Sequence, residues 1–413
     1  MTYDERIAQL FSLHRSVQTG GFSPDAYKPG LDSMMRFDAV LGHPHLSYPT
    51  VHVAGTNGKG SVCSMIAAAL ASTGLRVGLY TSPHLLDFRE RMKIIGKDGW
   101  TMIPRQDVLD FLDRYESAAA GLTFFEITTG LAFSWFASQK VDAAVIETGL
   151  GGRLDSTNII TPRLSVITSI GLDHCDLLGS TCAEIAAEKA GIFKPGVPAL
   201  VWGRDSGTQP VFEDVASRKG SPLHYAGDLA SLPDTLPQEA HAAVNYRTAA
   251  AALQLLGVQA SPDPLLHAAS LTGLRARWEI LREDPLTICD IGHNPPAISY
   301  NVSRLQALRQ TGNGSLRPLI VVYGAMADKD VASISHLLPV DATYILAAPA
   351  TPRAMDVGTL ALKLKHLRCR KSRSVADAVR KAFRLAAGLP DPIVYIGGST
   401  YVASETISYI ESV

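Results

Sequence analysis

The sequence predicts an α/β protein with two units: an N-terminal doubly wound, mostly parallel sheet and a smaller C-terminal Rossmann-like α/β domain. Two observations predict this fold class. Short apolar segments of strand length alternate with segments of helix length in two series, one on each side of residue 285. A glycine-rich turn also joins the first strand of the first series directly to a helix, as in the βαβ units of parallel sheets.

The first series follows a helical opening and a stretch rich in Gly, Pro and Ser, residues 17–34, which we interpret as a loop. Residues 61–73 repeat apolar side chains at helical spacing, and Gly74 stands where a C-cap would end that helix. The expected elements are strands 49–54, 76–81, 141–147, 164–169 and 197–202, and helices 61–73, 124–138 and 183–191.

The second series begins after Pro285 and repeats the same alternation. Its expected elements are strands 286–290, 319–324, 343–348 and 392–398, and helices 296–310 and 375–387. No long linker separates the two series. We place the domains at residues 1–273 and 274–413, with the boundary near residues 270–285.

Composition excludes several classes of protein. Of 413 residues 46% are hydrophobic and 19% charged, which argues against disorder. The net charge of -1 argues against a dedicated nucleic-acid partner. The five cysteines are scattered without a CxxC pair, as expected in a reducing compartment. We find no secretory signal and no apolar run of ~18 residues, so we predict a cytoplasmic protein without a membrane partner.

The most specific feature is the loop between the first strand and its helix: Gly55, Thr56, Asn57, Gly58, Lys59, Gly60 and Ser61. Glycines let backbone N–H groups face a polyphosphate, a lysine neutralises its charge, and a hydroxyl at the helix start can bind Mg²⁺. The spacing departs from a strict Walker A motif, and the alternative is a glycine turn with an exposed lysine. The position between strand and helix favours nucleotide phosphate binding.

Several motifs in this order resemble the Mur ligase superfamily, and more closely the folylpolyglutamate synthase and dihydrofolate synthase family. They are VAGTNGKGS (53–61), TSPHL (81–85), TFFEITTGLAF (123–133), ETGLGGRLDSTN (147–158), SIGLDH (169–174), EKAGIFKPG (188–196), DIGHNP (290–295) and GGSTYV (397–402). The resemblance implies ATP-dependent addition of L-glutamate to dihydropteroate or reduced folates through an acyl phosphate. It also implies ATP and two Mg²⁺ sites as cofactors, and a monomer.

The resemblance assigns metal and catalytic roles. Ser61 and Glu147 match ligands of a first Mg²⁺, and Ser82 is a hydroxyl ligand or substrate anchor beside it. His174 matches a ligand of a second Mg²⁺, although chemistry alone would favour Zn²⁺ or a general base. Lys189 matches a lysine that CO₂ converts to a carbamate, which requires a neutral amine. The expected catalytic set is Lys59, His174 and Lys189.

The remaining assignments concern the nucleotide. Asn245, Arg277, Asp290 and His293 correspond to groups that contact ATP across a cleft between the domains. The usual Pro-Gly-Arg is Arg275-Ala-Arg277 here, so which arginine faces the phosphates is open.

On the pterin side, Asp155 matches a position that contacts dihydropteroate, Phe125 lies in a block typical of bifunctional enzymes, and Arg91 can hold a substrate carboxylate. The alternatives are ordinary helix and surface roles for these three residues. At the level of the whole protein, the alternatives are a peptidoglycan-type Mur ligase acting on a UDP-muramyl substrate and a regulatory NTPase. Sequence leaves open whether the chain is monofunctional or bifunctional.

Overall fold

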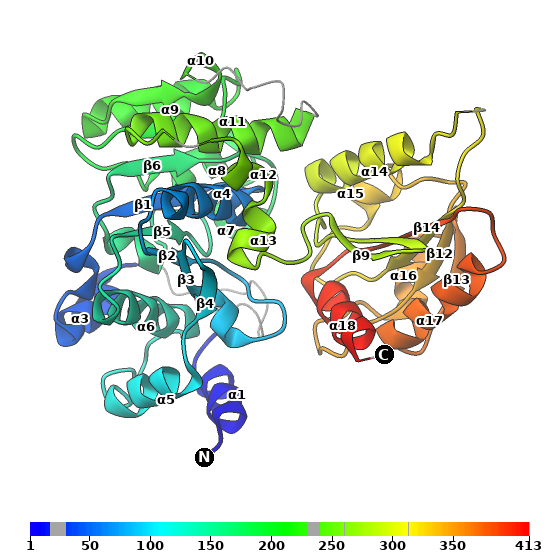
Figure 1. Ribbon diagram of the computed structural model, residues 1–413, viewed down its shortest axis with the longest axis horizontal. Helices are drawn as coiled ribbons and strands as arrows, with labels where there is room; N and C mark the ends of the chain where they lie inside the picture. Colours follow the sequence, from blue (N-terminus) through cyan, green and yellow to red (C-terminus); the bar gives the residue numbers. More distant parts are fainter. Residues whose placement is uncertain (17–29, 230–239, 260, 313, 413) are drawn as a thin grey trace. The chain divides into compact units, whose positions relative to one another are not determined.

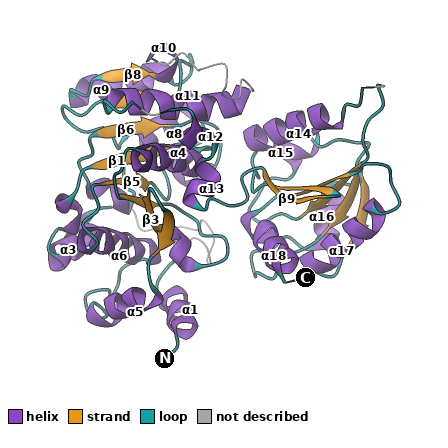
Figure 2. Ribbon diagram, viewed as in Figure 1, coloured by secondary structure: helices purple, strands orange, loops and turns teal. Residues whose placement is uncertain are grey.

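The computed structural model describes residues 1–16, 30–229, 240–259, 261–312 and 314–412. The chain divides into two compact units, Met1–Leu274 and Arg275–Val413 (Figure 1). Each unit is a mostly parallel sheet covered by helices on both faces (Figure 2). The expected α/β fold class is therefore confirmed. No helix in the described ranges is both long and apolar enough to cross a membrane.

The first unit contains an eight-stranded sheet in the order β4-β3-β2-β5-β1-β6-β7-β8. Five of its seven pairings are parallel, and the pairings β2–β3 and β3–β4 are antiparallel. The strands are β1 (Thr50–Ala54), β2 (Val77–Tyr80), β3 (Met92–Gly96), β4 (Gly99–Met102), β5 (Ala143–Glu147), β6 (Leu164–Ile167), β7 (Ala199–Val201) and β8 (Leu223–Tyr225).

Alternate side chains of each strand face different helical layers. Val145 of β5 packs toward α4 and α11, whereas Ala144 and Ile146 pack toward α6. The helices are α1 (Tyr3–Leu13), α3 (Asp32–Leu41), α4 (Lys59–Ser72), α5 (Arg105–Arg114), α6 (Phe124–Ser138), α7 (Cys175–Leu178), α8 (Cys182–Ala190), α9 (Gln209–Lys219), α10 (Ala226–Leu229), α11 (Ala240–Leu255), α12 (Asp263–Leu266) and α13 (Ala268–Thr272). Short 3₁₀ helices are η1 (Pro44–Ser47), η2 (Phe88–Arg91) and η3 (Ser156–Ile159).

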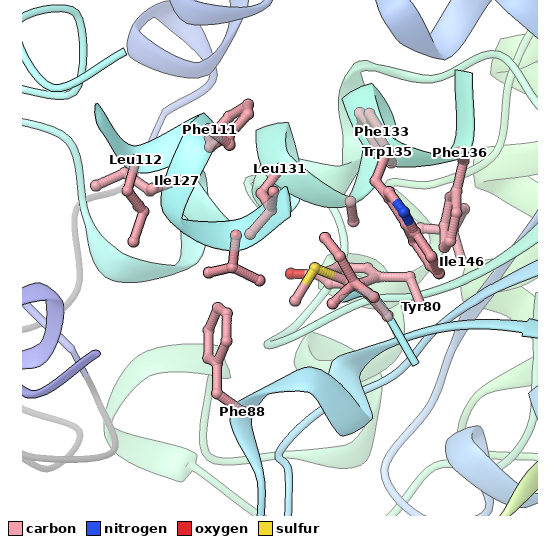
Figure 3. Packing of buried hydrophobic residues seen from close by; sticks show 14 of the residues in the cluster. Tyr80, Phe88, Phe111, Leu112, Ile127, Leu131, Phe133, Trp135, Phe136 and Ile146 are labelled. Carbon is pink, nitrogen blue, oxygen red and sulfur yellow. The ribbon is translucent and has the colours of Figure 1, made fainter. Parts of the chain in front are cut away.

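The core under α6 is rich in aromatic side chains. Figure 3 shows Tyr80, Phe88, Phe133 and Phe136 gathered around Leu131, all of them buried. A Thr123 capping box with Glu126 begins α6, and the helix then buries most of its surface. The helix therefore packs against the face of the sheet formed by β2 and β5.

The second unit contains a six-stranded sheet in the order β13-β12-β11-β14-β10-β9, parallel except for β9. Its strands are β9 (Glu279–Glu283), β10 (Leu286–Cys289), β11 (Leu319–Tyr323), β12 (Thr343–Leu346), β13 (Arg368–Lys371) and β14 (Ile393–Gly397). Its helices are α14 (Pro295–Arg309), α15 (Ala332–Ser335), α16 (Val357–Lys363), α17 (Val375–Ala386) and α18 (Thr400–Glu411).

The structure differs from the sequence prediction mainly at the edges of the sheets. Strands β3, β4, β8, β9 and β13 were not predicted, and α3 begins at Asp32, inside the stretch interpreted as a loop. Residues 17–29 of that stretch lie outside the described residues. Edge strands such as β13 carry charged side chains rather than an apolar run, so hydrophobic patterning does not reveal them.

Candidate functional site

The glycine-rich loop lies at the carboxyl edge of the central strand of the first unit. Strand β1 ends at Ala54, residues 55–58 form the loop, and α4 begins at Lys59. Gly58 is the N-cap of α4 at a φ of 85°, a left-handed conformation that favours glycine. The loop therefore presents the N-terminus of a buried helix, including Gly60 and Ser61 in its first turn, to any bound anion.

The chain segment after β6 holds this loop in place. Thr56 N–H donates to Ser169 O at 2.8 Å, and the Thr56 hydroxyl donates to Gly171 O at 3.1 Å. The Thr168 and Ser169 hydroxyls both donate to Asn57 O, at 2.6 and 3.0 Å. A Cβ at Gly55 would stand 2.0 Å from Thr168 Oγ1, so the two segments fit only with glycine there.

Two lysines meet at one carbonyl of the loop. Lys59 Nζ donates to Gly55 O at 3.0 Å, and Lys189 Nζ, from the end of α8, donates to the same oxygen at 2.9 Å. Burial, and secondly the charge of Lys59, lower the pKa of Lys189 to about 7. Lys189 is therefore an amine that loses its proton near neutral pH, next to a fixed positive charge.

The predicted Mg²⁺ ligands come from neighbouring strand ends. Glu147 closes β5 and is buried, and its carboxylate accepts the Ser82 N–H at 3.1 Å just after β2. Ser61 lies one strand away in the first turn of α4. Across the described ranges no group of three or more His, Cys, Asp and Glu side chains could enclose a metal ion. One carboxylate with hydroxyls suits Mg²⁺, which keeps waters and binds substrate phosphates.

His174 begins the short helix α7 at a φ of 52°, in the segment that follows β6. Its Nε2 lies 3.7 Å from Asp173 Oδ2, and its backbone N–H donates to Asp173 Oδ1 at 3.0 Å. The Asp173 carboxylate therefore lies beside the imidazole and accepts the backbone N–H of the same residue.

Asn245 lies on α11 beside the glycine-rich loop. A Cβ built on Gly58 would stand 2.3 Å from Asn245 Oδ1, so this amide reaches the N-cap of α4. Only the family resemblance predicts that Asn245 contacts the nucleotide. Its contact with the loop is a feature of the fold that no local pattern reveals.

Asp155 is buried, and backbone and hydroxyl groups occupy its carboxylate. Leu150 N–H donates to Oδ2 at 2.8 Å, while Thr157 N–H and the Thr157 hydroxyl donate to Oδ1. The Thr157 hydroxyl also meets His52 Nε2 at 2.9 Å. Burial raises the pKa of Asp155 and lowers that of His52 to about 3. His52 and Thr157 are not among the predicted site residues, because they resemble ordinary strand and loop residues.

Phe125 is half-buried on α6, and its ring covers Gly149. A Cβ on Gly149 would stand 2.5 Å from the ring, and the Tyr80 ring centroid lies 5.9 Å away. The aromatic face therefore lies directly above the turn that follows Glu147.

Arg91 is buried rather than exposed. Its Nε donates to His84 Nδ1 at 2.8 Å, and its guanidinium lies 5.1 Å from the Phe124 ring centroid. Burial and the nearby Arg91 charge lower the pKa of His84 to about 3, so this imidazole is a neutral acceptor. His84 of the motif at 81–85 and Arg91 of η2 therefore form one buried hydrogen-bonded pair.

The two arginines at the start of the second unit differ in their contacts. Arg275 pairs with Glu279 and Glu411, whereas Arg277 Nη1 donates to the adjacent Ala276 O at 3.4 Å.

The motif that follows β10 is folded tightly on itself. Asp290 accepts N–H groups of Trp278 and Gly292 and the Asn301 amide, at 2.7 to 2.8 Å. His293 Nδ1 donates to Ile291 O at 3.0 Å. These bonds fix a polar turn at the carboxyl edge of the second sheet.

Comparison with known proteins identifies the family. Residues 53–228 match the Mur ligase middle domain, and residues 276–400 match the Mur ligase glutamate ligase domain. Folylpolyglutamate synthase of Lacticaseibacillus casei is 32% identical, covering 98% of this chain and 97% of that protein. Dihydrofolate synthase/folylpolyglutamate synthase of Escherichia coli is 33% identical, covering 87% of this chain and 86% of that protein.

Solved structures agree with this result. E. coli FolC in complex with DHPP and ADP has a TM-score of 0.86 and 30% identity, covering 100% of this chain and 98% of that one. A bifunctional folylpolyglutamate synthase/dihydrofolate synthase with Mn, AMPPNP and L-glutamate bound has a TM-score of 0.83 and 30% identity, covering 100% and 98%. The chain therefore belongs to the Mur ligase superfamily, in its folylpolyglutamate synthase and dihydrofolate synthase family.

Proposed function

We propose that this protein is an ATP-dependent ligase that adds L-glutamate to dihydropteroate, to reduced folates or to both. The observation that carries the proposal is the meeting of Lys59 and Lys189 at Gly55 O, on a glycine-rich helix N-terminus next to the buried Glu147. Relatives across the whole chain act on folates, and related structures hold ADP, or AMPPNP with Mn and L-glutamate. The proposed cofactors are ATP and Mg²⁺.

The loop residues 55–61 would bind the ATP phosphates through backbone N–H groups, with Lys59 neutralising charge as the phosphoryl group moves to the substrate carboxylate. Ser61, Ser82 and Glu147 would hold one Mg²⁺, which supplies charge stabilisation when bound. His174 and the carbamate of Lys189 would hold a second. The lowered pKa of Lys189 supports this modification, because only a neutral amine reacts with CO₂.

The amino group of glutamate then attacks the acyl phosphate, and phosphate leaves as the amide forms. Asn245, Arg277, Asp290 and His293 would bind the nucleotide. Arg275 pairs with Glu279 and Glu411, and which of Arg275 and Arg277 contacts the phosphates stays open. Asp290 already accepts three hydrogen bonds, so we assign it to shaping the turn as well as to ribose binding.

On the acceptor side, Phe125 would stack on the pterin and Arg91 would hold a carboxylate. Asp155 would contact the pterin from within the loop that it organises. We further propose a cytoplasmic monomer whose units, residues 1–274 and 275–413, serve as ATP-binding and ligase domains.

One assay set tests the proposal. ADP release and amide formation are measured with glutamate plus dihydropteroate, plus tetrahydrofolate, or with a UDP-muramyl substrate. We expect a pterin substrate to stimulate both readouts and the UDP-muramyl substrate to stimulate neither. Stimulation by the muramyl substrate alone would instead identify a peptidoglycan-type ligase, and ATP hydrolysis independent of any acceptor would identify a regulatory NTPase.

A further inference from the structure

One edge of the second unit carries a dense positive charge. Residues 363–384 contain nine Lys and Arg and one acid, Asp377, in a chain whose net charge is -1. Eight of these cations are exposed, and we call them the basic edge: Lys363, Lys365, Arg368, Arg370, Lys371, Arg373, Arg380 and Arg384. Nine of the 38 Lys and Arg residues of the chain therefore lie in this one short segment.

The basic edge is built around an outermost strand. It runs from the end of α16 through β13 to one face of α17, and β13 pairs only with β12. Cys369 of β13 packs toward the hydrophobic core, so Arg368 and Arg370 both project toward the other face of the sheet. The free edge and the arginines together present both hydrogen-bond donors and charge.

These cations are not neutralised within the described part of the chain. Lys381, the ninth cation, pairs with Asp377 at 2.9 Å, but none of the eight makes an ion pair there. Two acids lie near these cations, but each is engaged elsewhere. The pKa of Asp341 is lowered mainly by its hydrogen bond to Arg309, and less by Arg368. The pKa of Asp356 is lowered mainly by the Thr359 N–H, and less by Lys371. Surface cations arranged in this way attract an anion of extended shape.

The chemistry of the basic edge favours carboxylates over nucleic acid. Binding of single-stranded nucleic acid relies on exposed aromatic rings for base stacking. The segment 363–384 has a single Phe, Tyr or Trp, Phe383, which is half-buried with the Arg282 guanidinium 5.3 Å from its ring centroid. A chain of carboxylates needs only charge and N–H donors, which the basic edge supplies.

The basic edge belongs to the same sheet as the turn after β10, to which we assign nucleotide binding. Register places Gly397, Tyr323, Leu346 and Lys371 in one row at the carboxyl edge of the sheet, where the turn after β10 also lies. Four strand spacings separate β10 from β13, about 19 Å. An extended chain of six residues spans about 20 Å. A glutamate chain of that length therefore spans the distance between this turn and the basic edge, and a single glutamate does not.

We propose that the basic edge binds the oligoglutamate tail of long-chain folate substrates. Each glutamate added to a folate leaves another free carboxylate, so the tail becomes a polyanion that matches the row of cations. This inference rests on the proposed function, because it requires a polyglutamate product. It assigns the basic edge a role in handling substrates of different length, apart from the ligation chemistry.

Direct binding tests the inference without ligation. Anisotropy of a fluorescein-labelled γ-linked hexaglutamate is measured with the full-length protein, with Arg368→Glu/Arg370→Glu and with the second variant Arg380→Glu/Arg384→Glu. The control is Arg114→Glu/Lys219→Glu, which changes charge equally at exposed sites of α5 and α9. We expect affinity to fall about tenfold or more in both edge variants but not in the control. Affinity that stays at the level of the unmodified protein in either edge variant, or an equal loss in the control, would overturn the inference.

Ligation assays separate the inference from the function. The kcat/KM for a hexaglutamyl folate should fall about fivefold in the edge variants, while that for the monoglutamate should stay unchanged, because only the hexaglutamyl tail offers a row of carboxylates to the basic edge. Ligation without hexaglutamate binding would refute the basic edge alone, and binding without ligation would refute the proposed function alone. A uridine-rich RNA that binds the edge more tightly than hexaglutamate would reassign it and overturn the inference.

Discussion

Lys189 shows how one side chain acquires chemistry from its surroundings. It is buried at the end of α8, donates to Gly55 O and stands beside the fixed charge of Lys59. We expect Lys189→Ala to lower ligation about 100-fold, because it removes a proposed metal-binding group, while AMPPNP affinity changes little. Ligation is measured by amide formation and nucleotide binding by calorimetry. Full ligation activity in this variant would exclude the carbamate.

A matched control and a pH profile sharpen that prediction. Lys194 is a half-buried lysine, and burial lowers its pKa to about 8. Its Nζ donates to Asn158 O at 2.7 Å rather than to the glycine-rich loop. Lys194→Ala should leave turnover largely intact. Because the neutral amine of Lys189 becomes available as pH rises through about 7, stimulation by bicarbonate should grow across that range. Stimulation that is independent of pH would count against Lys189.

Thr157 is a second residue whose effect depends on burial. Its hydroxyl donates to Asp155 and lies 2.9 Å from His52 Nε2, so His52 supplies the proton in that contact. Thr157→Val leaves the buried carboxylate with one donor fewer and should lower the free energy of unfolding by about 1–3 kcal/mol. Thr157→Ser keeps the hydroxyl and should lose little of that stability. Urea unfolding followed by circular dichroism compares the two variants with the unmodified protein. Equal stability of all three would contradict a stabilising role for the hydrogen bonds of Thr157 with Asp155 and His52.

At the scale of elements, the loop and α4 depend on glycine geometry. Gly58 has a φ of 85° and contacts Asn245, whereas Gly257 after α11 has a φ of 71° and open space around it. Gly257→Ala carries only left-handed strain, about 1–2 kcal/mol. Gly58→Ala should add a clash at the N-cap of α4 and weaken AMPPNP binding about tenfold, measured by calorimetry. Equal effects of both substitutions on nucleotide binding would mean that the N-cap geometry is unimportant.

The same elements show what sequence can and cannot predict. Helix α6 was predicted with its observed bounds, Phe124–Ser138, because its long apolar run is a local signal. Strand β13, Arg-Cys-Arg-Lys, was missed because its position in the sheet comes from pairing with β12.

In the candidate site, the loop 55–61 was visible as a motif, but its attachment to Thr168 and Ser169 is long-range. The burial of Arg91 against His84 was likewise hidden, because arginine in a polar segment predicts exposure.

At the scale of the whole molecule, the net charge near zero does not show that positive charge occurs in two different settings, buried in the first unit and exposed in the second. In the first unit, Lys59 and Lys189 are held at one carbonyl beside Glu147, where binding geometry decides their effect. In the second unit, eight exposed cations follow one sheet edge and act through solvent. Long-range attraction of this kind is screened over about 8–10 Å at moderate ionic strength, while buried contacts are screened much less. Added salt should therefore affect long-tailed substrates more than monoglutamates.

Each unit has its own hydrophobic core, so each should unfold as a separate cooperative transition. Ile66 of α4 is fully buried in the first unit, and Leu346 of β12 is fully buried in the second. Ile66→Ala and Leu346→Ala should each cost about 2–5 kcal/mol through lost packing, each within its own unit. Scanning calorimetry should then show one transition lowered in each variant and the other unchanged. AMPPNP with Mg²⁺ should raise the transition lowered by Ile66→Ala, since the phosphate loop belongs to that unit. A single transition that both substitutions lower equally would show that the two units fold as one.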